Sequence, residues 1–231
     1  MKATGLVLDA ERSVDVEPDE FYDLSRFGNN GVSTNAPTWV QLPSGLWVLN
    51  FIAASSQYIT CGTPASLQIS PRITVLAWVK GAVSGVTQSV LSKFDDNLQQ
   101  RSWDLGSLAG ADVLSGFISD NGEVGAHCKS WYSSIVVYDN TWHQVGMVFD
   151  AGTFELVIDG AFDPSPTKTI DVAITTIHLG TAPTCIGTAM HIGAPMWEFD
   201  GQIVLPRIYT WALSAGKIKQ HFEAERHFFG V

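Results

Sequence analysis

The sequence is poor in charge, in long hydrophobic runs and in glycosylation sites. Charged residues make up 16% of the 231 residues, against roughly 25% in ordinary globular proteins. No run approaches the roughly 18 apolar residues of a membrane span. The apolar stretch after Met1 is too short for the core of a signal peptide, and no Asn-X-Ser/Thr sequon occurs. We therefore expect a soluble chain with no visible secretion signal and no insertion into a membrane.

Cysteine and basic residues are scarce as well. Cys61, Cys128 and Cys185 lie far apart, and an odd number of cysteines cannot close into a disulfide framework. Their spacing does not fit a zinc site, so we expect three buried thiols. The 23 acidic and 13 basic residues give a net charge of −10. Because nucleic-acid binding relies on basic residues that contact phosphates, this charge argues against a nucleic-acid partner.

The sequence is rich in apolar and aromatic residues. Apolar residues make up 45% of the chain, with 12 Phe and 8 Trp, which excludes intrinsic disorder. About fourteen short apolar segments, many with a period of two, are bounded by Gly, Pro, Asn or Asp, which is typical of antiparallel strands. They lie at residues 5–9, 46–51, 57–61, 73–80, 89–94, 102–106, 113–119, 122–128, 142–149, 154–159, 169–172, 177–179, 190–193 and 201–209.

This pattern predicts an all-β protein, a two-sheet antiparallel sandwich with one short C-terminal helix. The helix is expected over residues 215–226, because apolar residues recur there at helical spacing and Ser214 can cap its N-terminus. No linker or repeat divides the chain. We expect a single domain over residues 1–231, with a core of about 5–226 and an apolar tail at 227–231.

Seven segments resemble, in order, the landmarks of the laminin-G-like, concanavalin A-like lectin/glucanase jelly rolls. They are Asp23–Ser25 with Gly28–Gly31, Phe51 with Tyr58–Ile59, Ile73–Lys80 around Trp78, Val90–Lys93, Thr141–Val145, Phe154–Gly160, and Ile192–Gly193 with Phe199–Ile203. The resemblance covers about residues 5–226. It departs at Val204–Tyr209, where the family usually has two acids. Members of the family include lectins, adhesion modules, glycanase domains and components of virus particles, so the resemblance implies the fold more firmly than the function.

The resemblance also implies a calcium site. Many jelly rolls of this type tie an opening loop to the closing strand through one calcium ion, and Asp23, Asn29, Asn30 and Asp200 fall on those positions. Calcium prefers carboxylate, amide and carbonyl oxygens. The alternative is a turn whose Asx side chains cap backbone groups.

Catalysis is not expected. A glycosidase needs two carboxylates facing one cleft, and the glucanase signature of this fold, E-x-D-x-x-E, is absent. The pairs Glu155 with Asp159 and Glu198 with Asp200 are the nearest candidates. The first two acids are too widely spaced along their strand, and the second pair is interpreted as structural. No nucleophile, zinc-protease or phosphate-loop motif occurs.

Carbohydrate binding needs exposed aromatic rings with polar neighbours. Candidate residues that are flanked by turns or polar residues are Trp39, Trp103, Trp131, Tyr132 and Trp197. Burial in the core is the alternative for each of them.

The C-terminal tail is a candidate interface. In an extended segment Phe228 and Phe229 would point to opposite sides, so one ring would be exposed in a monomer. A tail that folds back over its own helix is the alternative.

These observations favour a non-enzymatic surface protein, a structural, decoration or adhesion component of a phage or virus particle that contacts glycans. Its expected partners are other virion or surface proteins, in an oligomer or assembly, and its expected location is the virion or cell surface, or the cytoplasm where it is made. The alternative is a carbohydrate-binding module of a secreted protein, and a glycoside hydrolase is a weaker third.

Overall fold

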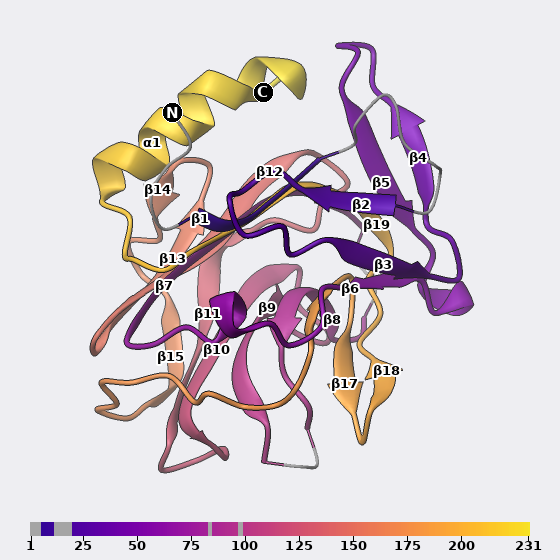
Figure 1. Cartoon of the computed structure of the whole chain (residues 1–231). Helices are drawn as coiled ribbons and strands as arrows, with labels where there is room; N and C mark the ends of the chain where they lie inside the picture. The colour runs from indigo at the N-terminus through magenta and orange to yellow at the C-terminus, as the bar shows by residue number, and fades with distance from the viewer. Residues whose placement is uncertain (1–5, 12–19, 83–84, 97–98) are drawn as a thin grey trace.

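Two antiparallel sheets pack face to face in the computed structural model, which describes residues 6–11, 20–82, 85–96 and 99–231 (Figure 1). We call them sheet I and sheet II. Sheet I contains, in chain order, β1 (Leu6–Glu11), β4 (Thr38–Gln41), β5 (Trp47–Phe51), β7 (Arg72–Gly81), β12 (His143–Asp150), β13 (Thr153–Ile158), β14 (Ala161–Phe162) and β19 (Gly201–Tyr209).

Sheet II is formed in the spatial order β2 (Glu20–Asp23), β3 (Gly31–Thr34), β6 (Tyr58–Thr60), β16 (Thr184–Ile186), β8 (Gln88–Lys93), β9 (Arg101–Ser107), β10 (Val113–Gly122), β11 (Cys128–Val136) and β15 (Thr167–Asp171). A separate hairpin, β17 (Ala189–His191) with β18 (Ala194–Met196), projects from the body at the lower right of Figure 1. Two short 3₁₀ turns, η1 (Ala53–Ser55) and η2 (Ala65–Leu67), flank β6.

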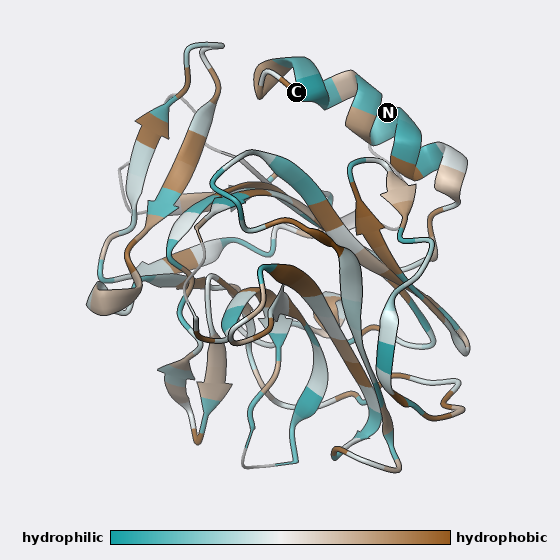
Figure 2. Cartoon of the chain, turned by 180° about the vertical axis from the view of Figure 1, so that it is seen from behind, coloured by the Kyte–Doolittle hydropathy of each residue, from teal (hydrophilic) through white to brown (hydrophobic). Residues whose placement is uncertain are grey.

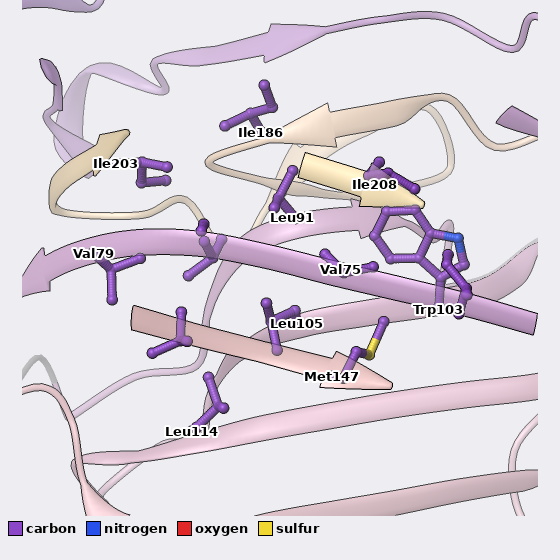
Figure 3. Close-up of a cluster of buried hydrophobic side chains, with 14 of the residues drawn as sticks. Val75, Val79, Leu91, Trp103, Leu105, Leu114, Met147, Ile186, Ile203 and Ile208 are labelled. Carbon is purple, nitrogen blue, oxygen red and sulfur yellow. The ribbon is translucent and has the colours of Figure 1, made fainter. Parts of the chain in front are cut away.

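The core lies between the two sheets, because alternate residues of each strand point inward. Val75, Met147 and Ile203 of sheet I meet side chains of sheet II in one buried cluster (Figure 3). The sheet II side chains labelled in that view are Leu91, Trp103, Leu105, Leu114 and Ile186.

The outer face of sheet I is covered by the C-terminal helix α1 (Ala215–Glu225) and the 3₁₀ turn η3 (Arg226–Phe228). Ser214 caps the helix by accepting a hydrogen bond from the backbone N–H of Lys217. The helix buries Ile218 against Leu76 and Val157 of the sheet. The exposed side of the helix is mainly hydrophilic, as Figure 2 shows from behind.

The structure confirms the jelly-roll sandwich with one C-terminal helix, but it corrects some strand positions. The strand expected at 122–128 is Cys128–Val136, because Gly122 and Gly125 adopt φ of 88° and 78° and turn the chain before it. Residues 177–179 form no strand, although Ile177 is buried. The strands β2, β3 and β4 were not predicted, because their sequences are short and polar and adjoin Gly, Asn and Pro. Residue 5 of the first expected strand lies outside the described residues.

Candidate functional site

A groove of about 270 Å³ lies on the outer face of sheet II. We call it the sheet II groove. Its lining combines aromatic rings with carboxyl and hydroxyl groups, from Phe94, Asp96, Asp104, Ser107, Ser115, Phe117, Ser130, Tyr132 and Trp197, with Thr87, Leu108, Gly116, Val124 and Ile170 around them.

The alternation of three neighbouring strands builds the floor of this groove. Asp104 of β9 lies opposite Phe117 of β10, and Phe117 lies opposite Ser130 of β11. Ser115 and Tyr132 form the next pair on the same face. The residues between these positions point into the core. The strands β9, β10 and β11 thus carry the groove on their outer face and part of the hydrophobic core on their inner face.

Aromatic rings line one side of the groove. The ring of Phe94 meets that of Phe117 edge to face, with centroids 5.4 Å apart, and that of Trp197 at 5.3 Å. Such tilted contacts are favourable for aromatic pairs. Phe94 is buried, whereas Phe117, Trp197 and Tyr132 are half-buried and present ring surface to the groove.

Trp197 has an unusual backbone conformation. Its φ is 56°, in the left-handed region that bulky residues rarely adopt. The backbone N–H of Ser89 donates to the carbonyl oxygen of Trp197 at 2.7 Å and helps to fix this conformation. Strained residues of this kind are found preferentially at functional sites. The strain places the Trp197 ring beside Phe94, at the wall of the groove.

The β17–β18 hairpin, which leads into Trp197, is held by two acidic residues. The buried carboxylate of Asp95 accepts hydrogen bonds from the backbone N–H groups of Ile192 (2.9 Å) and Gly193 (2.8 Å) at the hairpin tip. Asp96 forms an ion pair with Arg101 at 2.9 Å and lies 3.5 Å from His191. The charge of Asp96 is therefore largely balanced by its neighbours.

Asp104 is the buried acid of the groove. Its side chain is 4% exposed and accepts a short hydrogen bond from the Ser89 hydroxyl. Burial raises the pKa of Asp104 to about 7, against the smaller opposing effect of the Ser89 hydrogen bond. Among the residues that the structure describes, no lysine or arginine forms an ion pair with it. The Asp104 carboxyl group can therefore bind a hydrogen-bond donor or a positively charged group of a ligand.

The structure brings two of the five predicted glycan residues, Tyr132 and Trp197, into the groove. Trp103 and Trp131 belong to the core, 1% and 5% exposed, and their assignment to glycan contact is wrong because strand alternation turns them inward. Trp39 is half-buried elsewhere and stacks on Phe21 at 6.1 Å.

Sequence reasoning missed Phe94, Phe117 and Asp104. The signal for Asp104 was present: an acid lies between Trp103 and Leu105 in a strand, where alternation must place it on the face opposite to two large apolar residues. The contact of Phe94 with Trp197 joins distant parts of the chain, so no local sequence pattern predicts it.

Three of the predicted metal residues, Asp23, Asn29 and Asn30, are joined by hydrogen bonds within the opening loop, whereas Asp200 binds a different segment. Asp23 accepts from the backbone N–H of Asn29 at 2.7 Å, and from the backbone and the hydroxyl of Ser25. Asn30 accepts from the backbone N–H of Asp23, and Ser66 donates to Asn29. The Asp200 carboxylate accepts from the backbone N–H of Ala53. The described residues contain no group of three or more His, Cys, Asp or Glu placed to hold a metal ion.

Calcium between the opening loop and Asp200 stays a prediction. If one ion joins the two, excess calcium should raise the melting temperature, because a ligand that binds the native state stabilises it. The measurement compares thermal melting of metal-free protein in calcium with melting in chelator. Superimposable curves would remove the site.

Three of the four acids considered for catalysis have structural hydrogen-bond partners. Asp159 accepts from the backbone N–H of Gln144 and contacts His143 at 2.8 Å. Glu198 accepts from the Ser56 hydroxyl, and Asp200 is bound as described above. None of the four carboxylates lines the groove.

The two tail phenylalanines have different surroundings. Phe229 is 9% exposed and stacks on Trp78, with ring centroids 4.1 Å apart, and on Trp142 at 4.9 Å. The tail curls through η3 instead of extending, so Phe229 packs on its own domain. Phe228 is 37% exposed, against the ring of His227. An interface at this tail stays a prediction and would use Phe228.

Comparison with known proteins agrees with this architecture. The family model described as the concanavalin A-like lectin/glucanases superfamily matches residues 53–219. The chain therefore belongs to this superfamily. A search of curated proteins finds no match.

Solved structures with the same fold include receptor-binding parts of bacterial toxins. The binding domain of Paraclostridial Mosquitocidal Protein 1 superposes with a TM-score of 0.71 at 14% identity, over 98% of this chain and 55% of that one. A structure of botulinum neurotoxin type C, which depends on two ganglioside molecules to enter cells, gives 0.68 at 12% identity, over 95% and 51%. The binding domain of botulinum neurotoxin DC, in complex with SialylT, gives 0.67 at 12% identity, over 95% and 51%.

These likenesses show the fold alone. The chain spans about half the length of the toxin structures that it matches, so the ligands in their names are properties of those longer proteins. Among the described residues, no helix is long and apolar enough to cross a membrane.

Proposed function

We propose that this chain is a non-enzymatic, lectin-like carbohydrate-binding module and that the sheet II groove is its binding site. The observation that carries the proposal is the joint presence of half-buried aromatic rings and polar groups in one hollow of about 270 Å³. Ligand sites combine apolar walls with a few convergent polar groups, typically in pockets of about 300–1,000 Å³. The smaller volume here suits a single sugar unit.

Each part of the groove has a role in this proposal. The rings of Trp197 and Tyr132 can cover the apolar face of a pyranose, and the hydroxyls of Ser115 and Ser130 with the Asp104 carboxyl can bind its hydroxyl groups. Receptor and glycan binding by toxins of the same fold support the proposal as an analogy of fold.

A binding role is favoured over hydrolysis by the carboxyl groups of the groove. Glycoside hydrolysis uses two carboxyl groups, one of them a general acid. Asp104 has the burial of a general acid, but Asp96, the second acid of the groove, is held in an ion pair with Arg101. A place in a phage or virus particle, beside other surface proteins, stays a prediction from the sequence, as does the alternative of a secreted module.

The first test replaces the groove aromatics. Trp197→Ala and Tyr132→Ala are each expected to weaken binding of the best ligand from a glycan array by at least about tenfold, or about 1.4 kcal/mol, because they remove stacking surface. Isothermal titration calorimetry measures the change.

Phe228→Ala is the control, since it removes an exposed ring far from the groove lining. It should leave the affinity unchanged, and melting curves should show that all variants are folded. Equal affinities of wild type and both groove variants would contradict the proposed site.

A further inference from the structure

We propose that the sheet II groove selects glycans that carry a protonated amine, the amino sugars with a free amino group, over neutral and anionic glycans. This inference rests on the proposed function and adds the ligand class. Three observations carry it: a buried carboxyl group without a cation, aromatic rings beside it, and the sign of the remaining charge.

The buried Asp104 differs from the half-buried Asp96 and the exposed Asp171, which each have a basic partner. Asp96 is paired with Arg101 at 2.9 Å, and Asp171 with Lys129 at 2.6 Å. Asp104 is more deeply buried than either, and the described residues supply it with the Ser89 hydroxyl and no basic partner. A buried carboxylate is costly unless it is paired with a cation. Because Asp104 lines the groove, a bound ligand can supply that cation.

The aromatic rings favour a cation at the same place. Phe117 is the cross-strand neighbour of Asp104, and Phe94 meets both Phe117 and Trp197 within 5.4 Å between ring centroids. The faces of aromatic rings attract ammonium groups, most strongly those of Trp, when water is excluded. A carboxylate on the floor with aromatic walls therefore complements an ammonium group and the apolar face of the sugar that carries it.

The charge of the groove disfavours an anionic sugar. The lining contains two carboxyl groups, those of Asp96 and Asp104, and no lysine, arginine or histidine, and the chain has a net charge of −10. The carboxylate of a sialic acid would find no basic side chain in the lining to pair with, and it would face the Asp104 carboxyl group, a like charge when ionised. This chain is thus expected to differ in specificity from the toxin domain solved with SialylT.

The test compares ligands that differ in one substituent. The probes are chitotetraose with free amines, its fully N-acetylated form, and sialyllactose, titrated at pH 7 and about 0.15 M salt, where long-range attraction to the acidic surface is screened. The free-amine form is expected to bind at least about tenfold more tightly than the N-acetylated form, and sialyllactose not at all.

Two variants assign the preference to the groove. Asp104→Asn should abolish the difference between the amine and acetyl forms, whereas Trp197→Ala should weaken both. Glu223→Gln is the matched control: it removes one exposed negative charge on α1 and should change nothing. Retention of the amine preference in Asp104→Asn, or amine binding that is insensitive to Trp197→Ala, would overturn the inference.

Binding of the three probes to the wild type also tests the amine preference, so the inference can be tested even if a variant does not fold. Equal or tighter binding of the N-acetylated or sialylated probe, lost in Trp197→Ala, would overturn the amine preference and leave the proposed function standing. Absence of binding to every class of glycan would remove the proposed function itself.

Discussion

Asp104→Asn is expected to be more stable than the wild type, and this gain in the free energy of unfolding should be roughly 2–3 kcal/mol larger at pH 8 than at pH 5. The reason is the buried carboxyl group. Burial raises the pKa of Asp104 from its ordinary value of 3.8 to about 7. Asparagine keeps the shape and can still accept from Ser89, but it cannot ionise.

The direction follows from proton binding. Between about pH 4 and pH 7 the folded state keeps the Asp104 proton that the unfolded state has lost, so wild-type stability falls as the pH rises. Below the unfolded pKa both states are protonated and the penalty is absent. Above about pH 7 the penalty is complete. The variant lacks this term, so its advantage grows over the same window.

Urea unfolding of wild type and variant at pH 5, 6, 7 and 8 measures this difference. Comparing the two proteins at each pH cancels the other titrating groups, including His143, whose pKa is raised by its contact with Asp159. At pH 8 the melting temperature of the variant should gain roughly 5–10 °C more than at pH 5. A constant difference across the range would show that Asp104 is not buried as described.

An acid that weakens its own fold fits a binding site. Proteins tolerate destabilising groups mainly where function uses them. Asp104→Asn should therefore act in opposite directions in two experiments, with higher stability at pH 8 and lost discrimination between amine and acetyl ligands. If the variant gained stability but kept its discrimination between amine and acetyl ligands, Asp104 would be buried as described but would not select the ligand.

The sequence was sufficient for those features that depend on local pattern. The segments at 73–80, 89–94, 113–119 and 201–209 are strands, because alternating or continuous apolar residues can be buried only between sheets. Ser214 and the spacing after it predicted the helix. Tyr132 and Trp197 were found because polar residues and turns flank them.

The rest of the site depends on contacts that are distant in the sequence. Trp197 reaches Phe94 across about a hundred residues, and Asp95 fixes the hairpin that carries it by binding Ile192 and Gly193. The positive φ of Trp197 could not be predicted, because the position holds a tryptophan and not the glycine that usually marks this conformation. Trp103 and Trp131 were misplaced because they were judged by their polar neighbours and not by the alternation of their strands, which turns both side chains inward.

Glu225→Ala is expected to lower the free energy of unfolding by about 3–5 kcal/mol, since it breaks a buried ion pair by removing one partner. Glu225 is 9% exposed and joins α1 to sheet I. It accepts from the indole N–H of Trp78 at 2.8 Å and from the Arg207 guanidinium. Without it, the Arg207 guanidinium loses this ion pair and the Trp78 indole loses its acceptor.

The pH dependence of this contact is opposite to that of Asp104. Burial pushes the pKa of Glu225 upward, but the contacts with His221, Arg207 and Trp78 outweigh burial and hold the pKa below its ordinary value of 4.5. A depressed folded pKa gives stability that is complete above the unfolded pKa and lost as the pH falls through the folded one. The defect of Glu225→Ala should therefore be largest near neutral pH and shrink in acid.

Glu223→Ala, two residues earlier on the same helix, is the control for Glu225→Ala. Its exposed contact with Arg226 is 3.7 Å long, and such surface pairs contribute under about 1 kcal/mol. Urea unfolding followed by tryptophan fluorescence compares the variants, because Phe222 and Phe229 stack on Trp78 and report the docking of the C-terminal segment. If Glu225→Ala and Glu223→Ala were equally mild, the C-terminal segment would be held to sheet I by these aromatic contacts and not by the buried ion pair.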